Sequence, residues 1–535
     1  MRRLATVIVV LMVLLAGCGG TATDDTEDGT TAPTSGDEPT TTDGTDSTGP
    51  NGTGGSLADP ASDTLGWEAG YWYNESIAVD RSDGLNDSEL DKVVARGMAR
   101  VEQIRKVEFE KTVPVSVISR ADYRERLASG NTSTKARLHQ NVKWEAVFAV
   151  NESADAVAAQ RANYGSGVGG FYSPSNEEIV IVSDSDTPEM NEVTLSQELF
   201  HALQDQRWNI SSFDQSTTEL HNARDGIIEG DGNYVDQLYK QRCTANWDCL
   251  LPQQQGGQSG GAANINVAMY QVQLQPYSDG VAFVKNIKEQ QGWEGVNSVY
   301  ENPPASTEQT IHPAAYESDQ PTDVAIDDTS SNGWHVLDVA GPTDHASFGE
   351  AGMFVMLWYP SFEKSQQTGS AQNVVLPYRA HFNIAGQGLD QTDPYNYADE
   401  HTAGWDGDRL LPYVKGDASA SSETGYVWKS TWDSEQDAKQ FADGYQKLLG
   451  YHGAESVDGR PNTYRIPDGQ EFGDAFSVVQ RGDTVVIVNA PSVDALSDVH
   501  AGSGTTNDSS VTMDNEDESV GASDYRIAAI AAIAA

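Results

Sequence analysis

The apolar positions divide the chain into a short apolar run, a long polar stretch and a foldable part. Residues 4–15 form an apolar run in which Thr6 is the one polar residue, whereas residues 19–57 hold almost no large apolar side chain. From residue 67 onwards, apolar side chains recur at helical and strand spacings until about residue 490. We therefore divide the chain into five parts: residues 1–18, 19–65, 66–330, 331–495 and 496–535.

The first foldable part, residues 66–330, alternates helical and strand patterns. The spacing of its apolar side chains predicts helices at 90–107, 121–127 and 190–206, and strands at 113–118, 168–174 and 178–182. The last two strands are joined by a polar turn, and the second is apolar enough to be buried. Thr187, with Pro188 in the first turn, is the expected cap of the third helix.

The second foldable part, residues 331–495, also mixes both patterns. It predicts a strand at 426–432, a helix at 435–449 capped by Asp433-Ser434, and a hairpin of residues 476–479 and 484–488. The expected fold class is therefore α+β. A small mixed sheet would pack on helix 190–206 beside a helical lobe, with an α+β portion at the C-terminal end. The remaining residues, 496–535, predict a flexible polar tail.

The N-terminus has the pattern of an export signal. Arg2 and Arg3 precede the apolar run, which is shorter than an ordinary membrane span, and Ala16-Gly17-Cys18 follows it. This segment resembles the lipobox of bacterial and archaeal lipoproteins, which implies lipidation of Cys18 and an anchor in the outer face of the cell membrane. An uncleaved anchor with a chance cysteine is the alternative. The paired arginines allow Tat export, and Sec export stays open.

Residues 19–65 are expected to form a disordered linker between this anchor and the folded part. They consist mainly of Thr, Asp, Gly, Ser, Pro and Glu, and the next basic residue after Arg3 is Arg81. Such a stretch cannot bury enough apolar surface to offset the entropy lost on ordering.

Charge narrows the choice of partners. The chain has 33 Lys and Arg against 80 Asp and Glu, a formal net charge of −47. This field repels nucleic acid, so no nucleic-acid partner is expected. An acidic surface suits very salty water, where ions screen its self-repulsion, which makes a halophilic protein the favoured interpretation. An ordinary acidic secreted protein is the alternative.

Cys243 and Cys249 are the only cysteines besides Cys18. In an oxidising exterior, two cysteines six positions apart most simply form a small disulfide loop. A ring this short adds little entropic stability.

Candidate chemistry lies in the helix expected after the buried strand, which contains Gln197-Glu198-Leu199-Phe200-His201. Zincin metallopeptidases have His-Glu-x-x-His there, with two imidazoles on one helix face to bind zinc and a Glu to polarise the zinc-bound water. This chain has the Glu and the second His but a Gln at the first ligand position. A neutral amide oxygen is a poorer zinc ligand than an imidazole nitrogen.

A third ligand in the gluzincin branch is a Glu on a following helix, and Glu229 in Ile228-Glu229-Gly230-Asp231 fits that role, 28 positions after His201. The chain resembles a family of metallopeptidase-like surface proteins, including haloarchaeal lipoproteins, over roughly residues 110–490. The matching segments are Gly170 to Pro174, Leu199 to Gln206, Ile228 to Asp231, Gly404 to Arg409 and Trp432 to Ala438. The resemblance implies a zincin-like core with Glu198 as general base and His201 and Glu229 holding the metal.

Two functional hypotheses remain open. In the first, the protein is a gluzincin-like hydrolase of peptides or proteins, with zinc weakly bound or absent and hydrolysis weakened or lost because of Gln197. In the second, it is a non-catalytic binding or envelope-structural protein that uses a degenerate zincin cleft. His221, expected in a loop, is a further candidate ligand, and Asp406 and Asp408 are candidates to contact a cation.

Overall fold

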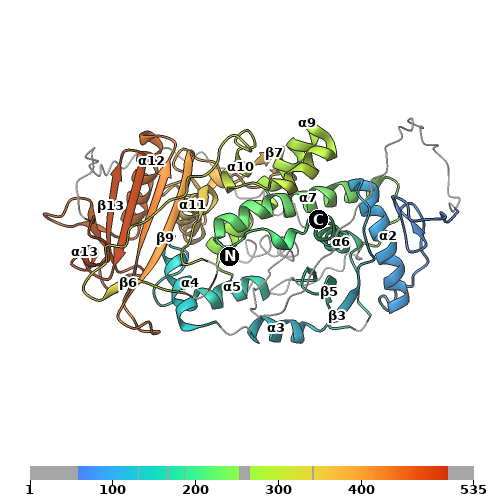
Figure 1. Cartoon of the computed structure of the whole chain (residues 1–535), viewed down its shortest axis with the longest axis horizontal. Helices are drawn as coiled ribbons and strands as arrows, with labels where there is room; N and C mark the ends of the chain where they lie inside the picture. Colours follow the sequence, from blue (N-terminus) through green and yellow to red (C-terminus); the bar gives the residue numbers. More distant parts are fainter. Residues whose placement is uncertain are drawn as a thin grey trace, which may run out of the picture.

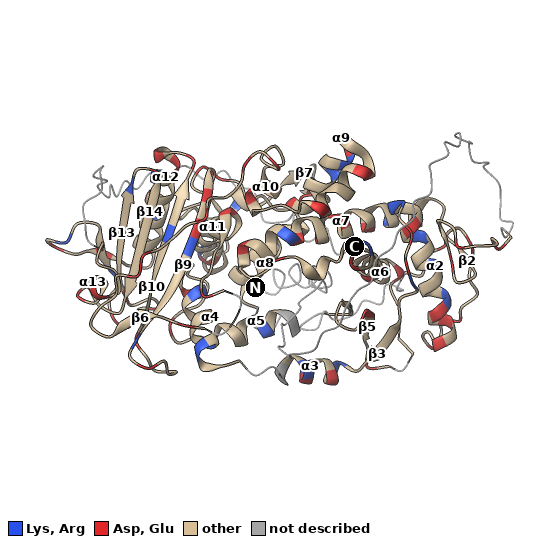
Figure 2. Cartoon of the chain, in the orientation of Figure 1, with Lys and Arg blue, Asp and Glu red and all other residues tan. Residues whose placement is uncertain are grey.

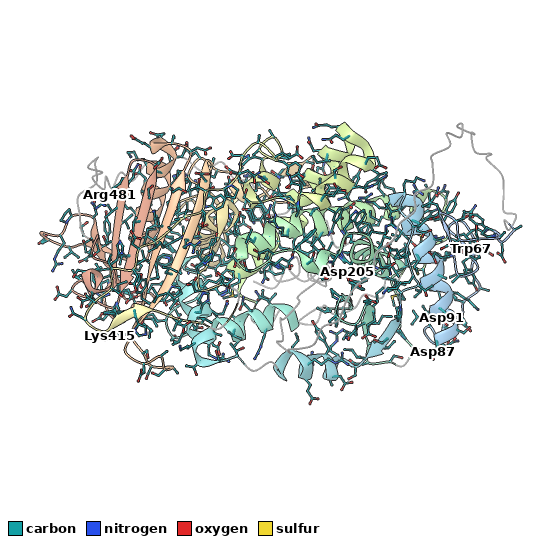
Figure 3. The ribbon with its side chains drawn as sticks, in the orientation of Figure 1. Trp67, Asp87, Asp91, Asp205, Lys415 and Arg481 are labelled. Atoms are coloured by element: carbon teal, nitrogen blue, oxygen red, sulfur yellow. A yellow bond between two sulfur atoms is a disulfide. The ribbon has the colours of Figure 1, made fainter. Side chains whose placement is uncertain are left out.

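The computed structural model describes residues 58–129, 132–165, 168–185, 187–188, 190–251, 265–339, 341 and 343–503. The expected signal segment with Cys18, most of the expected linker and most of the expected tail lie outside the described residues. The molecule is elongated, with a large sheet at one end, helix α2 at the other and helices α6 and α7 between them (Figure 1). Lys415 and Trp67 mark these two ends (Figure 3).

The elements follow one another along the chain in two series. Up to residue 311 they are β1 (Trp67–Glu68), β2 (Tyr71–Trp72), α2 (Asp87–Arg105), β3 (Val115–Ile118), α3 (Arg120–Ser129), α4 (Thr134–Ala146), α5 (Ala156–Gly165), β4 (Gly170–Ser173), β5 (Glu178–Val182), α6 (Glu192–Trp208), η2 (Ile210–Ser212), α7 (Thr218–Ala245), α8 (Val267–Gln273), η3 (Gln275–Tyr277), α9 (Asp279–Glu301) and α10 (Thr307–Ile311). From residue 334 they are β6 (Trp334–Val336), α11 (Gly349–Thr368), η4 (Tyr378–His381), β7 (Ile384–Ala385), β8 (Gly388–Leu389), β9 (Trp405–Lys415), β10 (Thr424–Trp432), α12 (Glu435–Tyr451), β11 (Glu455–Ser456), β12 (Thr463–Arg465), β13 (Ala475–Arg481), β14 (Thr484–Ala490) and α13 (Leu496–Val499).

A small mixed sheet lies beside α6. Its strand order is β3-β5-β4, with β3 parallel and β4 antiparallel to the central β5. Residues 179–182 of β5 are all buried, as the apolar run predicts. The α+β class is thus confirmed. Strand β4 lies at the edge of this sheet and contacts α6.

Helix α6 begins later than expected, and a different residue caps it. The Asn191 side chain accepts a hydrogen bond from the Val193 N–H, the usual role of an N-cap residue. The expectation that Thr187 caps the helix is wrong, because the Thr187 hydroxyl donates to the Asp83 carbonyl instead.

Buried ion pairs hold α2 against α6 and α7. Arg96 and Arg100 of α2 both pair with Glu192, the first residue of α6, and Arg105 pairs with Asp231 of α7. These side chains are almost completely removed from solvent, so the charges are compensated by one another. The pairs fix the two helices that carry the candidate site.

The large sheet is antiparallel, with strand order β11-β12-β13-β14-β10-β9-β6. Helix α12 contacts β10, β13 and β14. The largest apolar core joins this sheet to residues 142–156 and 268–274, so parts of α4 and α8 pack with the C-terminal portion. The core therefore includes residues from both sides of residue 331, the expected boundary between the two foldable parts.

Acidic side chains are spread over the whole molecule rather than gathered on one element (Figure 2). Among the described helices, none is both long and apolar enough to cross a bilayer.

Candidate metal centre

The packing of α6 on α7 brings His201 and Glu229 together. His201 Nε2 lies 3.5 Å from Glu229 Oε2, and both residues are 0% exposed. Gly232, one turn after Glu229, permits this approach, because a Cβ atom there would lie 3.2 Å from His201 Cε1. Two residues 28 positions apart in sequence thus face each other in the interior.

The orientation of the His201 ring is fixed by a chain of hydrogen bonds. Gln204 Nε2 donates to the Ile228 carbonyl at 2.8 Å and to the Tyr300 hydroxyl at 2.7 Å, so its Oε1 faces His201 Nδ1, at 2.7 Å. An amide oxygen only accepts, so Nδ1 carries a proton, and Nε2 on the other side of the ring faces Glu229. Outer hydrogen bonds of this kind orient the histidine ligands of metal sites.

The segment around Glu229 is anchored from the opposite side. Asp231 accepts a hydrogen bond from the Tyr300 hydroxyl at 2.8 Å and pairs with Arg105 Nε at 2.9 Å. The Tyr300 hydroxyl also accepts the hydrogen bond from Gln204 Nε2. The anchors of His201 and of α7 therefore meet at one hydroxyl group.

Glu198 is held by the edge strand of the small sheet. Its Oε2 accepts a hydrogen bond from the Tyr172 N–H of β4 at 2.8 Å, and the residue is buried. Burial raises the pKa of the Glu198 carboxyl to about 8. Burial lowers the pKa of His201, but the Glu229 carboxylate outweighs it and raises the pKa to about 9. The Tyr172 hydroxyl also donates to Asp205, a residue of α6 that is labelled in Figure 3.

Three polar atoms at the centre of this arrangement have no hydrogen-bond partner: His201 Nε2, Glu229 Oε1 and Glu229 Oε2. A buried polar atom without a partner costs about 1–3 kcal/mol, more when it is charged. An imidazole nitrogen and a carboxylate are zinc donors. The donor chemistry and the orphaned atoms together fit a metal ion held between the two helices.

The donor set is nevertheless short of a normal zinc site. Gln197 is 3% exposed and lies one turn before His201, on the same helix face, and its amide makes no hydrogen bond to His201 or Glu229. Across the described residues, groups of three or more His, Cys, Asp or Glu donors converge at two other places, and neither group includes His201 or Glu229. The structure brings together two of the expected ligands.

His221 lies in the first turn of α7, so the expectation of a loop is wrong. Its Nε2 is 3.3 Å from Asp225 Oδ2, one turn further along the same helix. Asp225 and Glu229 follow at helical spacing, which places the three side chains on one face of α7.

The Asp408 carboxylate is engaged by hydrogen-bond donors of the protein itself. It accepts hydrogen bonds from the Ser347 hydroxyl, from the N–H groups of Phe348 and Gly349, and from the Trp428 indole. These bonds tie strand β9 to the start of α11 and use the acceptor capacity of the carboxylate. Asp406 accepts from Thr322 instead, at 2.7 Å from its hydroxyl.

Cys243 and Cys249 form a disulfide with a sulfur–sulfur distance of 2.01 Å. Cys243 lies in the last turns of α7 and Cys249 in the segment that follows. The disulfide links the C-terminal end of α7, the helix that carries Glu229, to the segment that follows it.

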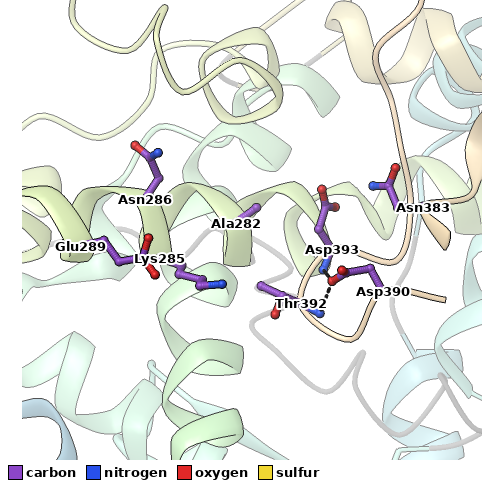
Figure 4. A pocket seen from close by; sticks show the side chains of 8 residues that line it. All are labelled: Ala282, Lys285, Asn286, Glu289, Asn383, Asp390, Thr392 and Asp393. Atoms are coloured by element: carbon purple, nitrogen blue, oxygen red, sulfur yellow. Dashed lines mark hydrogen bonds between the residues drawn. The ribbon is translucent and has the colours of Figure 1, made fainter. Parts of the chain in front are cut away.

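A surface pocket of about 390 Å³ lies elsewhere, between α9 and residues 383–393 (Figure 4). Its lining is polar, and Asp390 accepts hydrogen bonds from the N–H groups of Thr392 and Asp393 within it. No residue of α6 or α7 lines it. The pocket and the His201–Glu229 pair are therefore separate features.

Comparison with known proteins assigns no function to either feature. A family model described as a domain of unknown function (DUF8575) matches residues 336–500, which include most of the large sheet but neither α6 nor α7. No curated protein and no solved structure matches the chain.

Proposed function

We propose that this protein is an exported, lipid-anchored surface protein with a gluzincin-like core in which zinc binding is weakened and peptide hydrolysis is weakened or lost. The observation that carries the proposal is the pairing of His201 Nε2 with Glu229 Oε2 at 3.5 Å in the buried interior, where neither atom has a hydrogen-bond partner. The signal pattern before Cys18 and the net charge of −47 support export to a saline exterior.

His201 and Glu229 would hold a zinc ion, with Gln197 adding a weak oxygen from the same helix face. When bound, zinc supplies Lewis-acid activation of water. Glu198 would accept a proton at Oε1, because the Tyr172 N–H already occupies Oε2. Catalytic zinc sites normally have three good protein ligands, and this chain has two. Partial zinc occupancy and little hydrolysis are therefore expected.

The closed environment of the site supports the alternative, a non-catalytic binding or structural role. His201 is 0% exposed, and Gln197 and Glu198 are each 3% exposed. A hydrolase must admit both a peptide and a water molecule to these atoms. A core that buries these residues gains rigidity from the helix pair whether or not hydrolysis takes place.

The test is to restore the missing ligand. Gln197→His places an imidazole one turn from His201, so zinc occupancy of the purified protein should rise towards one ion per chain. Gln290→His, on an exposed position of α9, is the matched control and should leave the metal content unchanged. Any peptidase activity gained by Gln197→His should disappear when Glu198→Gln is added.

Metal analysis and peptide hydrolysis separate the outcomes. Stoichiometric zinc with chelator-sensitive hydrolysis in the unmodified protein would show that Gln197 does not weaken the site. A Gln197→His variant that binds zinc yet hydrolyses nothing would favour the binding or structural role. Failure of that variant to bind zinc would contradict the gluzincin-like core.

A further inference from the structure

A group of three carboxylates that includes neither His201 nor Glu229 joins α10 to the C-terminal portion. One oxygen each from Glu308, Asp319 and Asp433 lies within 4.8 Å of the others. Glu308 belongs to α10, Asp319 to the segment that follows it, and Asp433 to the turn between β10 and α12. The group therefore connects residues that are more than a hundred positions apart in sequence.

Glu308 is the observation that separates this group from ordinary surface acids. The residue is 6% exposed, and in the described part of the chain its carboxylate accepts no hydrogen bond and pairs with no Lys, Arg or His. The charged groups with the strongest electrostatic effect on it are acidic: Glu350, Asp319, Asp433 and Glu219, in that order. A buried carboxylate with no partner and only negative neighbours is costly unless a cation or a proton neutralises it.

Glu350 adds a second unpaired atom beside Glu308. It is 0% exposed, and its Oε1 lies 3.1 Å from His312 Nε2, whereas its Oε2 is buried without a hydrogen-bond partner. It is the charge that acts most strongly on Glu308. Two buried carboxylates at this place thus have unused acceptor atoms.

The three ligand candidates are held in position by their surroundings. The Gln309 side chain accepts from the Ala305 N–H at 2.7 Å and donates to the Asp319 carbonyl, which fixes the segment next to Glu308. The Asp433 N–H donates to the Gly404 carbonyl at 2.8 Å. These hydrogen bonds hold the backbone segments next to the three carboxylates in place.

We propose that Glu308, Asp319 and Asp433 bind a calcium-type divalent cation that joins the α10 segment to the β10–α12 turn. Hard cations prefer carboxylate oxygens, and calcium binds them at about 2.3–2.6 Å, so two ligands of one ion lie at most about 5 Å apart. The observed spacing fits that limit. Calcium accepts irregular geometry and completes its shell with water, whereas Mg²⁺ demands a near-ideal octahedron. The site shares no residue with the proposed zinc site, so each proposal stands or falls by itself.

Terbium, a luminescent substitute for calcium, is the direct probe, because Trp432 precedes Asp433 and can sensitise its emission. The full-length protein is stripped with a chelator, dialysed into constant high KCl, and titrated with Tb³⁺ and then with Ca²⁺ as competitor. We expect saturable terbium emission that calcium abolishes. Calcium at saturating concentration should also raise Tm by about 2–5 °C, and Mg²⁺ should raise it less.

Two variants and two controls locate the site. Glu308→Gln and Asp433→Asn should each weaken terbium and calcium binding at least about tenfold. Glu317→Gln removes a charge from an exposed position of the same segment, and Glu152→Gln removes one from the other acidic group, so both should bind like the unmodified protein. If Glu308→Gln fails to fold, the exposed Asp433→Asn carries the test. Absence of saturable binding in the unmodified protein, or unchanged affinity in Asp433→Asn, would overturn the proposal.

Discussion

Replacing Glu192 with Gln tests whether buried charges hold the site helix in place. The Glu192 carboxylate accepts hydrogen bonds from Arg96 at 2.8 Å, Arg100 at 2.5 Å, the Tyr239 hydroxyl at 2.7 Å and the Leu250 N–H at 2.7 Å. Gln keeps the size of the side chain. It removes the negative charge and turns one of the two acceptor atoms into a donor.

The expected cost follows from the burial of the partners. The side chains of Arg96, Arg100 and Glu192 are 0%, 1% and 0% exposed. Removing one member of a buried ion pair costs about 3–5 kcal/mol, because the remaining charge stays buried without compensation. Here two guanidinium groups depend on one carboxylate, but their contributions are not additive. We expect a loss of about 4–6 kcal/mol from a total stability of about 5–15 kcal/mol.

The assay is urea unfolding at constant high KCl, followed by far-UV circular dichroism. Glu423→Gln is the matched control, because Glu423 pairs with Lys415 where the two side chains are 55% and 44% exposed. An exposed pair contributes about 0–1 kcal/mol, and salt screens it. If Glu192→Gln loses no more than Glu423→Gln, the argument that buried ion pairs position α6 is wrong.

Three further predictions concern pH, packing and location. Burial lowers the pKa of His381 in the folded protein to about 4, whereas a histidine in the unfolded chain has a pKa of about 6.5. As the pH falls, the unfolded chain therefore binds a proton first. The free energy of unfolding should drop by about 3 kcal/mol between pH 6.5 and 4. Urea midpoints should show a smaller drop for His381→Gln than for the exposed control His335→Gln. Gly230→Ala should cost about 1–3 kcal/mol, because its Cβ would lie 2.3 Å from a backbone oxygen of α9, whereas Gly450→Ala, with open space around it, should be neutral or slightly stabilising in the same assay. Cys18→Ser should release the protein from membranes in cell fractionation, and unchanged membrane association would contradict a lipid anchor.

The helices and strands that follow one clear period could be predicted from sequence. The helix expected at 190–206 is α6 at Glu192–Trp208, and the strand expected at 178–182 is β5 with the same bounds. Helix α11 was not predictable in this way. Its residues 349–358 are buried on all sides, so the apolar stripe that marks a surface helix is absent, and Pro360 lies inside it. The α-helices α8, α9 and α10, between residues 267 and 311, were also not predicted.

The candidate site was predictable only where it depends on sequence spacing. The interval between His201 and Glu229 identified the pair, but nothing in the sequence indicated that Tyr172 would donate to Glu198 or that Tyr300 would link the two helices. These contacts join residues 26 and 96 positions apart, and tertiary packing decides them. The matching run from Leu199 to Gln206 contains Gln204, which was the one available signal for the residue that orients His201.

The geometry of the pair does not depend on a third metal ligand. His201 is oriented by Gln204, Gln204 by Tyr300, and Asp231 by Arg105, all through bonds between protein groups. A substitution at residue 197 should therefore leave the helix packing intact, because bonds between protein groups bring the two helices together. In small zinc domains, by contrast, the folding free energy is supplied by the metal. A histidine introduced at residue 197 would therefore lie near His201 and Glu229 side chains that are already held in place.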